Sequence, residues 1–223
     1  MYENFKYLDA VAQKEITKGV FSGSVLSVIH KGETVYLKSF GLADKEKNIP
    51  MKTDSIFRLF SMSKPVTAAA AMILIERGLL DTRHPLKWFI PEFSDPVVLD
   101  ENGERPADRD ITIGDLLTMT SGIPYPDGTP AGQKMGALWG EQSEKYLKGE
   151  KLLDTVSFAK EMGKRPLMFS PGEKWMYGAS ADIMGAVIEV VSGMKFGDFL
   201  RKEIFEPSKN THLNAYLWLF AFF

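Results

Sequence analysis

The chain has 223 residues, and its 27 basic side chains are nearly balanced by 29 acidic ones, giving a net charge of -2. Such a balance offers no electrostatic footprint for nucleic acid, so no nucleic-acid partner is expected. The sequence contains no cysteine, which excludes disulfides, zinc-thiolate sites and thiol nucleophiles. Its length suits a single domain with a substantial core.

The N-terminal residues show no basic start followed by an apolar run, the pattern of a secretory signal peptide. The densest apolar stretch is AYLWLFAFF, residues 215–223. It is about half as long as a helix that crosses a bilayer. The sequence therefore predicts a cytoplasmic protein with no membrane span.

The first sixty residues combine a helical pattern with a strand pattern. Apolar positions at helical spacing predict an amphipathic helix over residues 3–18. Two segments rich in β-branched and aromatic residues, 24–29 and 34–40, are separated by Lys31 and Gly32. This arrangement is typical of a β-hairpin.

Helical patterns dominate after residue 60. Residues 66–77 are apolar nearly all round, which predicts a buried helix that stops at Gly78. The polar residues 95–110 predict a loop. Thr112 and Asp115 form a capping-box pattern that predicts a short helix directly after them.

The later part of the chain is interpreted as one long loop followed by helices. Residues 122–140 hold eight glycines or prolines, which predicts a long structureless loop that is either functional or mobile. Further helices are predicted over 152–162, 179–191 and 196–204. The order indicates an α+β protein, an antiparallel sheet flanked by helices with a helical lobe. Because two strands make no stable sheet alone, the strands that complete it are expected to be missing.

Several catalytic and metal-binding patterns are absent from the sequence. It has no Gly-x-Ser-x-Gly elbow, no His-Glu-x-x-His pair and no phosphate-binding loop. The three histidines, His30, His84 and His212, are interpreted as surface or structural residues. No metal and no cofactor is expected.

The pattern Ser-x-x-Lys remains, and it occurs three times. The pairs are Ser61 with Lys64, Ser157 with Lys160, and Ser192 with Lys195. The second pair lies inside an amphipathic helix and the third at a helix end, so both are interpreted as solvated. Only Ser61 stands where an apolar run meets a buried helix, which makes it the candidate nucleophile.

The position of Ser61 suits acyl-transfer chemistry. Backbone N–H groups and the helix dipole at a helix start stabilise negative charge on an attacked carbonyl. Residues three apart share a helix face, so the Lys64 amine can reach the Ser61 hydroxyl. Lowering a lysine pKa from ~10.4 to 7 costs about 4.6 kcal/mol, which a dry pocket supplies. The tetrapeptide alone also allows Ser61 to be a helix cap, with Lys64 in solvent.

Longer strings resemble the serine β-lactamase-related family, which includes class C β-lactamases, esterase relatives and D-Ala-D-Ala-type peptidases. IFRLFSMSKPVTAAAAMILIERGLLD resembles its nucleophile segment, and SGSVLSVIHKGETVYLKSFGLAD its first hairpin. ITIGDLLTMTSGIPY resembles its LLTHTSG segment, and SPGEKWMYGASADIMGAVIEVVSG the segment that carries a catalytic tyrosine. The resemblance covers about residues 10–206.

The resemblance implies roles for three residues. Ser61 would be the acylated nucleophile, Lys64 its partner, and Tyr177 the phenol or phenolate that passes the proton to the leaving group. The implied substrates are small-molecule esters, amides or β-lactams. Ala179 stands where the family has the asparagine of Tyr-x-Asn, which disfavours β-lactamase activity and favours an esterase. Met119 stands where histidine is usual.

The resemblance also implies a domain organisation. Residues 1–206 would be the N-terminal portion of one β-lactamase-like domain, with a helix and hairpin over 1–60 and a mostly helical lobe over 61–206. Residues 207–223 form an atypical apolar tail. The later Lys-Thr-Gly or His-x-Gly strand of the family is missing, which suggests truncation. An exposed sheet edge would then favour self-association.

Three hypotheses about function follow. The first is a serine hydrolase that forms an acyl-enzyme on an ester or amide, as an esterase, D-peptidase or β-lactamase-like enzyme. The second is a catalytically incompetent, truncated fragment of that fold. The third is a non-enzymatic module that binds peptides or peptidoglycan.

Overall fold

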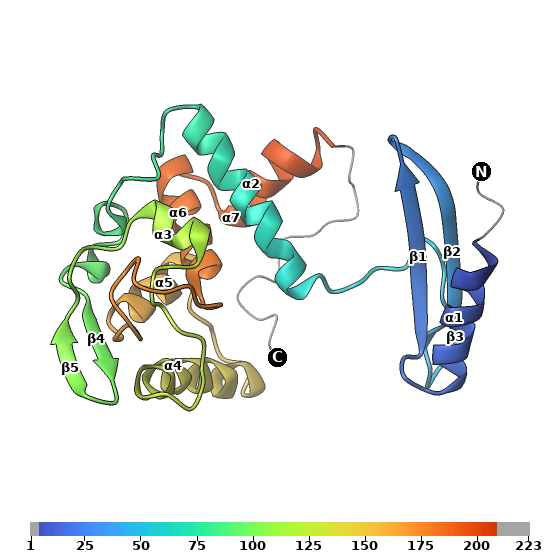
Figure 1. Cartoon of the computed structure of the whole chain (residues 1–223), viewed down its shortest axis with the longest axis horizontal. Coiled ribbons are helices and arrows are strands. Elements are labelled where there is room, and N and C mark those ends of the chain that lie inside the picture. Colours follow the sequence, from blue (N-terminus) through green and yellow to red (C-terminus); the bar gives the residue numbers. More distant parts are fainter. Residues whose placement is uncertain (1–4, 209–223) are drawn as a thin grey trace. The chain divides into compact units, whose positions relative to one another are not determined.

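The computed structural model describes residues 5–208 and divides the chain into two compact units, Met1–Arg58 and Leu59–Phe223 (Figure 1). Each unit is described by itself. Most of the apolar tail predicted over 207–223 lies outside the described residues.

The first unit is a three-stranded antiparallel sheet with one helix packed against its middle strand (Figure 1). Its elements are α1 (Lys6–Thr17), β1 (Gly23–His30), β2 (Glu33–Asp44) and β3 (Ile49–Pro50), with strand order β1-β2-β3. The predicted hairpin is confirmed. Lys31 and Gly32 both have positive φ at its tight turn, 50° and 83°, which matches the twist of the flanking strands.

The second unit holds the remaining helices and one small hairpin. Its elements are α2 (Ser63–Glu76), β4 (Val97–Asp100), β5 (Gly103–Pro106), α3 (Ile113–Thr118), α4 (Pro130–Leu147), α5 (Thr155–Gly163), α6 (Ser180–Ser192) and α7 (Phe196–Leu200). Short 3-10 turns cover Phe60–Met62, Leu86–Trp88 and Pro91–Phe93, and a π-helical turn covers Arg201–Phe205.

Helix α6 is the centre of this unit, because it packs against α2, α3, α5 and α7 (Figure 1). Every residue from Ser180 to Glu189 is buried except Asp182, which is partly buried. A helix covered on all sides must be apolar all round, which is the pattern of this segment. The helix ends at Gly193, whose φ of 68° is the left-handed conformation favoured after a helix.

Two predicted loops are wrong, because tertiary packing outweighs composition. Residues 95–110 form the β4–β5 hairpin instead, with Val98 fully buried. Helix α4 begins inside the glycine- and proline-rich segment 122–140, with Pro130 as its first residue and Thr129 as its cap. Buried apolar side chains on one face of α4 compensate for the glycines within it.

Helix α2 differs from its prediction in extent and in burial. It begins at Ser63, so that Pro65 lies in the first turn, where a missing N–H costs nothing. Ala70, Ala71 and Leu74 are buried on one face, whereas Met72 is 53% exposed. The expected burial on all sides is therefore wrong for the residues that the structure describes.

No helix within residues 5–208 is both long and apolar enough to span a membrane. The cytoplasmic location stays a prediction.

Candidate active site

Ser61 and Lys64 meet at the start of α2. Ser61 lies in the 3-10 turn that leads directly into the helix, and Lys64 is the second helical residue. The Lys64 Nζ donates a hydrogen bond of 3.2 Å to the Ser61 Oγ. The turn opens at Phe60 with a φ of 46°, a conformation that is strained for an aromatic residue and is often found beside functional sites.

Tyr177 reaches the same place from a distant part of the chain. It lies in the segment between α5 and α6, and the Lys64 Nζ sits 4.7 Å from the centre of its ring. Such a cation over an aromatic face gains about 0.5–2 kcal/mol, depending on desolvation. The structure thus brings together all three residues that the sequence singled out, because α2 packs against α6.

The segment that follows α3 holds the Tyr177 segment by its backbone. The Met176 N–H donates to the Met119 carbonyl at 3.0 Å, where Met119 ends α3 in a left-handed conformation. Gly178 runs so close to the same segment that an added Cβ would lie 2.2 Å from the Ile123 carbonyl oxygen. Only glycine fits there, so the two segments behave as one paired unit that fixes Tyr177.

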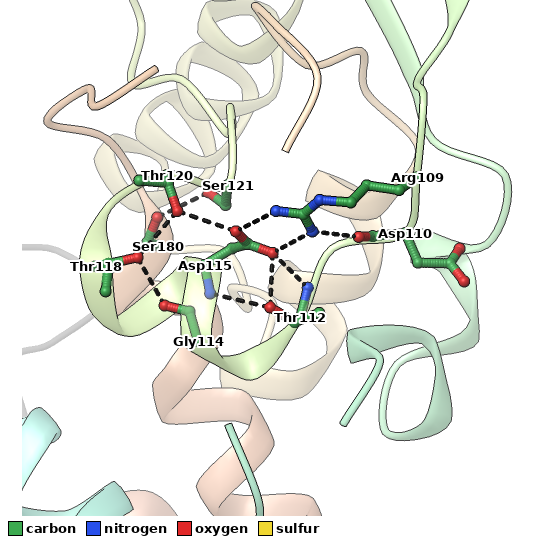
Figure 2. Close-up of polar contacts among 9 residues, drawn as sticks. All are labelled: Arg109, Asp110, Thr112, Gly114, Asp115, Thr118, Thr120, Ser121 and Ser180. Atoms are coloured by element: carbon green, nitrogen blue, oxygen red, sulfur yellow. Dashed lines mark hydrogen bonds and ion pairs between the residues drawn. The ribbon is translucent and has the colours of Figure 1, made fainter. Parts of the chain in front are cut away.

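A buried carboxylate anchors this paired unit (Figure 2). Arg109 donates to Asp115 twice, through Nη1 at 2.7 Å and Nη2 at 2.8 Å, and Thr112 and Thr120 add further hydrogen bonds. Burial alone would raise the pKa of Asp115, but these hydrogen bonds outweigh it and lower the pKa to about 2. The capping box predicted from the sequence is present here, whereas the role of Arg109 was missed.

A second buried contact joins the same segment to α6. The Ser121 and Ser180 hydroxyls lie 2.8 Å apart, and both residues are 1% exposed (Figure 2). Ser180 is the first residue of α6, three positions after Tyr177. The hydroxyl pair therefore ties the helix start to the segment after α3.

Tyr125 and Asp182 also belong to the site, and sequence reasoning missed both. The Tyr125 hydroxyl donates to the Asp182 Oδ2 at 2.8 Å. The Tyr125 ring centre lies 5.4 Å from the Lys64 Nζ and 6.0 Å from the Tyr177 ring centre. Burial raises the pKa of Asp182 to about 6, against the lowering effects of Tyr125 and Lys64. One signal could have pointed to Asp182, a lone charge in the apolar start of a buried helix.

The neighbours of Tyr177 favour its phenolate. Partial burial raises its pKa, but hydrogen bonding with Lys64 and Ser61 and the Lys64 charge lower it further, so the net pKa lies below 10.0. The charge of Asp182 acts in the opposite direction and raises the Tyr177 pKa. The lowered pKa increases the fraction of Tyr177 that is phenolate, and the phenolate can accept a proton from a serine hydroxyl.

The site is open. Ser61 is exposed, Tyr177 is 46% exposed, and Lys64 is only partly buried. The dry pocket expected from the sequence is not formed by the described residues. Lys64 also has no carboxylate within ion-pairing distance in the described part of the chain, so its charge is met by aromatic faces and the Ser61 hydroxyl.

The other two Ser-x-x-Lys pairs are arranged differently. Lys160 pairs with Glu92 at 3.6 Å, and Lys195 pairs with Glu189 at 3.3 Å. The Ser192 hydroxyl donates to a backbone carbonyl of its own helix at 2.6 Å. Both lysine side chains are ion-paired with carboxylates and remain exposed, Lys160 by 46% and Lys195 by 63%, which agrees with their interpretation as solvated.

No group of three or more His, Cys, Asp or Glu side chains within residues 5–208 is arranged to hold a metal ion.

Comparison with known proteins places these features in a family. The model of the family described as Beta-lactamase matches residues 8–217. Esterase EstB of Burkholderia gladioli is 35% identical over 189 residues, which cover 83% of this chain and 45% of the esterase.

Two solved structures are similar in fold. EstCE1, a hydrolase with promiscuous acyltransferase activity, has a TM-score of 0.74 at 27% identity, covering 91% of this chain and 50% of its own. Simvastatin synthase (LovD) from Aspergillus terreus has a TM-score of 0.73 at 25% identity, covering 95% of this chain and 54% of its own. The chain spans about half the length of these relatives.

Proposed function

Because this chain belongs to the beta-lactamase family, we propose that it is a serine hydrolase that forms an acyl-enzyme on small-molecule esters or amides. One observation carries the proposal, the 3.2 Å hydrogen bond from Lys64 to Ser61 beneath the ring of Tyr177. A hydroxyl, an amine and a phenol in mutual reach are the groups that a serine nucleophile needs for activation.

The proposed reaction begins with attack of the Ser61 oxygen on the substrate carbonyl. The hydroxyl proton passes to the phenolate of Tyr177, whose charge Lys64 stabilises. The tetrahedral intermediate then collapses, and Tyr177 returns the proton to the leaving alcohol or amine. Water attacks the resulting acyl-Ser61 ester in the same way, which releases the acid and restores the serine.

Esters are the proposed substrates in preference to β-lactams. Ala179 stands two residues after Tyr177 and is fully buried in the core, so no amide side chain projects from this position. The relative EstB is named an esterase, and EstCE1 is described as a hydrolase that also transfers acyl groups. An acyl-enzyme accounts for both activities, because an alcohol can replace water as the second nucleophile.

A fluorophosphonate probe tests the proposal, because it phosphonylates an activated serine. We expect the folded chain to be labelled once, on Ser61, as located by digestion and mass spectrometry. Ser61→Ala should abolish the label. Ser157→Ala and Ser192→Ala are matched controls that should keep it, since their lysines are paired with carboxylates. Labelling of another serine, or none in folded protein, would refute the assignment.

The second candidate is a catalytically incompetent fragment of the same fold, which the openness of the site favours. Ser61 and Tyr177 lie in contact with solvent, where water screens the charges that catalysis uses. This candidate predicts a folded chain without label, together with self-association in sedimentation experiments. Saturable binding of a D-Ala-D-Ala peptide without acylation would instead identify a binding module.

We further propose that residues 1–206 are a portion of one β-lactamase-like domain, in which 1–60 supply part of the sheet and 61–206 the helical lobe. The family match across residues 8–217 supports this organisation. Cooperative unfolding of both units in one transition would support it, and two separate transitions would contradict it.

A further inference from the structure

We propose that Tyr125 and Asp182 are a positioning pair that holds the Lys64 ammonium against Ser61 and balances its charge beside Tyr177. The inference rests on the proposed function and extends it by two residues that need not touch the substrate. Its basis is the arrangement of two rings, one carboxylate and one ammonium.

The two tyrosine rings form a cradle for the amine. The Lys64 Nζ lies 4.7 Å from the Tyr177 ring centre and 5.4 Å from the Tyr125 ring centre. The ring centres are 6.0 Å apart and the planes are tilted by 48°. A lysine side chain has many rotamers, so two aromatic faces that attract its ammonium restrict where it points.

Asp182 fixes one side of this cradle. Its Oδ2 accepts the hydrogen bond from the Tyr125 hydroxyl at 2.8 Å, and Tyr125 also packs edge-on against the Trp139 ring. Asp182 is the third residue of α6, the helix that begins just after Tyr177. The start of α6 thus positions Tyr177 through the backbone that directly precedes the helix, and it positions Tyr125 through the side chain of Asp182.

The surroundings of Asp182 do little to stabilise a charged carboxylate. A small cavity of about 10 Å³ beside it, enough for one water molecule, is lined by uncharged residues. These are Thr155, Phe158, Ala159, Met162, Gly185 and Phe196. Asp182 forms no ion pair with lysine or arginine in the described part of the chain, unlike Asp115 with its bidentate Arg109.

Even a partly buried carboxylate such as Asp182 destabilises a fold when it has no ion pair, and a neutral side chain could accept the same hydrogen bond at lower cost. The charge has a clear effect within the site, however. It attracts the Lys64 ammonium and raises the pKa of Tyr177, opposite to the effect of Lys64. The presence of a carboxylate at position 182 is therefore better explained by its effect on the protonation of Tyr177 than by a contribution to stability.

The test compares Asp182→Asn, Tyr125→Phe and the double variant in the full 223-residue chain. Asp108→Asn is a control on an exposed aspartate, and Tyr146→Phe is a control on a tyrosine that is 55% exposed. For each variant, kcat and KM are measured on p-nitrophenyl butyrate from pH 5 to 9. The rate of fluorophosphonate labelling and the denaturant midpoint of unfolding are measured alongside.

Asp182→Asn is expected to lower kcat and the labelling rate about 10- to 100-fold, with KM changed less than about threefold. Its unfolding midpoint should rise at pH 8. Wild-type activity should fall below about pH 6, where Asp182 becomes protonated, and this fall should be absent in Asp182→Asn. Tyr125→Phe should slow the reaction and lower the midpoint above pH 6, because it removes the hydrogen bond that Asp182 accepts. The double variant should regain stability without regaining activity.

A merely structural pair would give the opposite pattern, with lower stability in Asp182→Asn and unchanged kcat in the folded fraction. That result would overturn the inference while labelling of wild-type Ser61 still supported the proposed function. Absence of labelling in the wild-type chain would remove the proposed function, and the role of the pair with it.

Discussion

The second unit contains two polar clusters, each built around one charged side chain, and the two charges differ in the partners they have. Around Asp115, one carboxylate receives two hydrogen bonds from Arg109 and others from Thr112 and Thr120 (Figure 2). Around Ser61, one ammonium has a single hydroxyl partner and no paired carboxylate among the described residues. The Asp115 carboxylate thus has an ion pair and several hydrogen bonds, whereas the Lys64 ammonium has one hydrogen bond and no ion pair among the described residues.

The difference separates a cluster that stabilises the fold from one that the proposed reaction would use. A buried charge whose hydrogen bonds are all made stabilises one backbone arrangement. Here the Asp115 carboxylate supports the segment after α3, to which the Met176 N–H donates a hydrogen bond. A charge met only by ring faces and a hydroxyl remains available to a reaction, and the fold gains less from it. Substitutions in the two clusters should therefore differ in whether they affect activity or stability.

Replacing Lys64 by methionine should give the largest effect. Loss of the amine removes the charge that favours the Tyr177 phenolate, and proton transfer of this kind contributes about 10²- to 10⁴-fold to rate. We expect fluorophosphonate labelling to slow by this factor, with little change in the unfolding midpoint. Lys195→Met is the control, since Lys195 is paired with Glu189. Equal labelling by both variants would contradict the assignment.

Gly178→Ala should lower both stability and activity, because the new Cβ would lie 2.2 Å from the Ile123 carbonyl oxygen. The two backbone segments must separate, at a cost of about 3 kcal/mol, and Tyr177 moves with them. Denaturant unfolding measures the first effect and probe labelling the second. In contrast, Gly140→Ala in α4 meets nothing within 4 Å and should stabilise the chain by about 0.5–1 kcal/mol.

The local elements of this unit could be predicted, whereas its long-range contacts could not. The capping box of Thr112 and Asp115 and the end of α6 at Gly193 follow from a few neighbouring residues. The Ser61–Lys64 contact follows from helical spacing, since the residues are three apart. Tyr125 and Asp182 are 57 residues apart, and no periodicity in the sequence relates them.

The two incorrect loop predictions arose because composition was considered without the tertiary contacts of each segment. Helix α4 was predicted as a loop because its glycines and prolines were counted without the tertiary contacts that compensate for them. The β4–β5 hairpin was missed because its polar composition concealed the run from Val97 to Leu99, in which Val98 is fully buried. Tyr177 was assigned through resemblance to a family, since nothing local distinguishes it from a packed aromatic residue.

Arg109→Met should destabilise the fold without direct effect on chemistry. It leaves the Asp115 carboxylate, which is 5% exposed, without its ion pair. Breaking a fully buried pair costs about 3–5 kcal/mol, and because the Arg109 side chain is 45% exposed we expect about 2 kcal/mol. Arg83→Met removes an exposed ion pair and should cost less than about 1 kcal/mol. Urea unfolding at pH 7 distinguishes these values.

The pH dependence of stability gives the finest separation of the two clusters. The Asp115 pKa is lowered from 3.8 to about 2, so its contribution is present above pH 3.8 and lost as the pH falls through 2. This difference corresponds to about 2 kcal/mol at neutral pH. Asp115→Asn should therefore be less stable than wild type at pH 7, and the difference should shrink toward pH 2.

Asp182 should behave in the opposite sense, because its pKa is raised from 3.8 to about 6. The stability that its protonated form provides is fully present below pH 3.8 and lost as the pH rises through 6, which amounts to roughly 3 kcal/mol before relaxation. Asp182→Asn should thus match wild type near pH 3.5 and exceed it at pH 8. Parallel stability curves for the two aspartate variants would show that both clusters serve the fold alone.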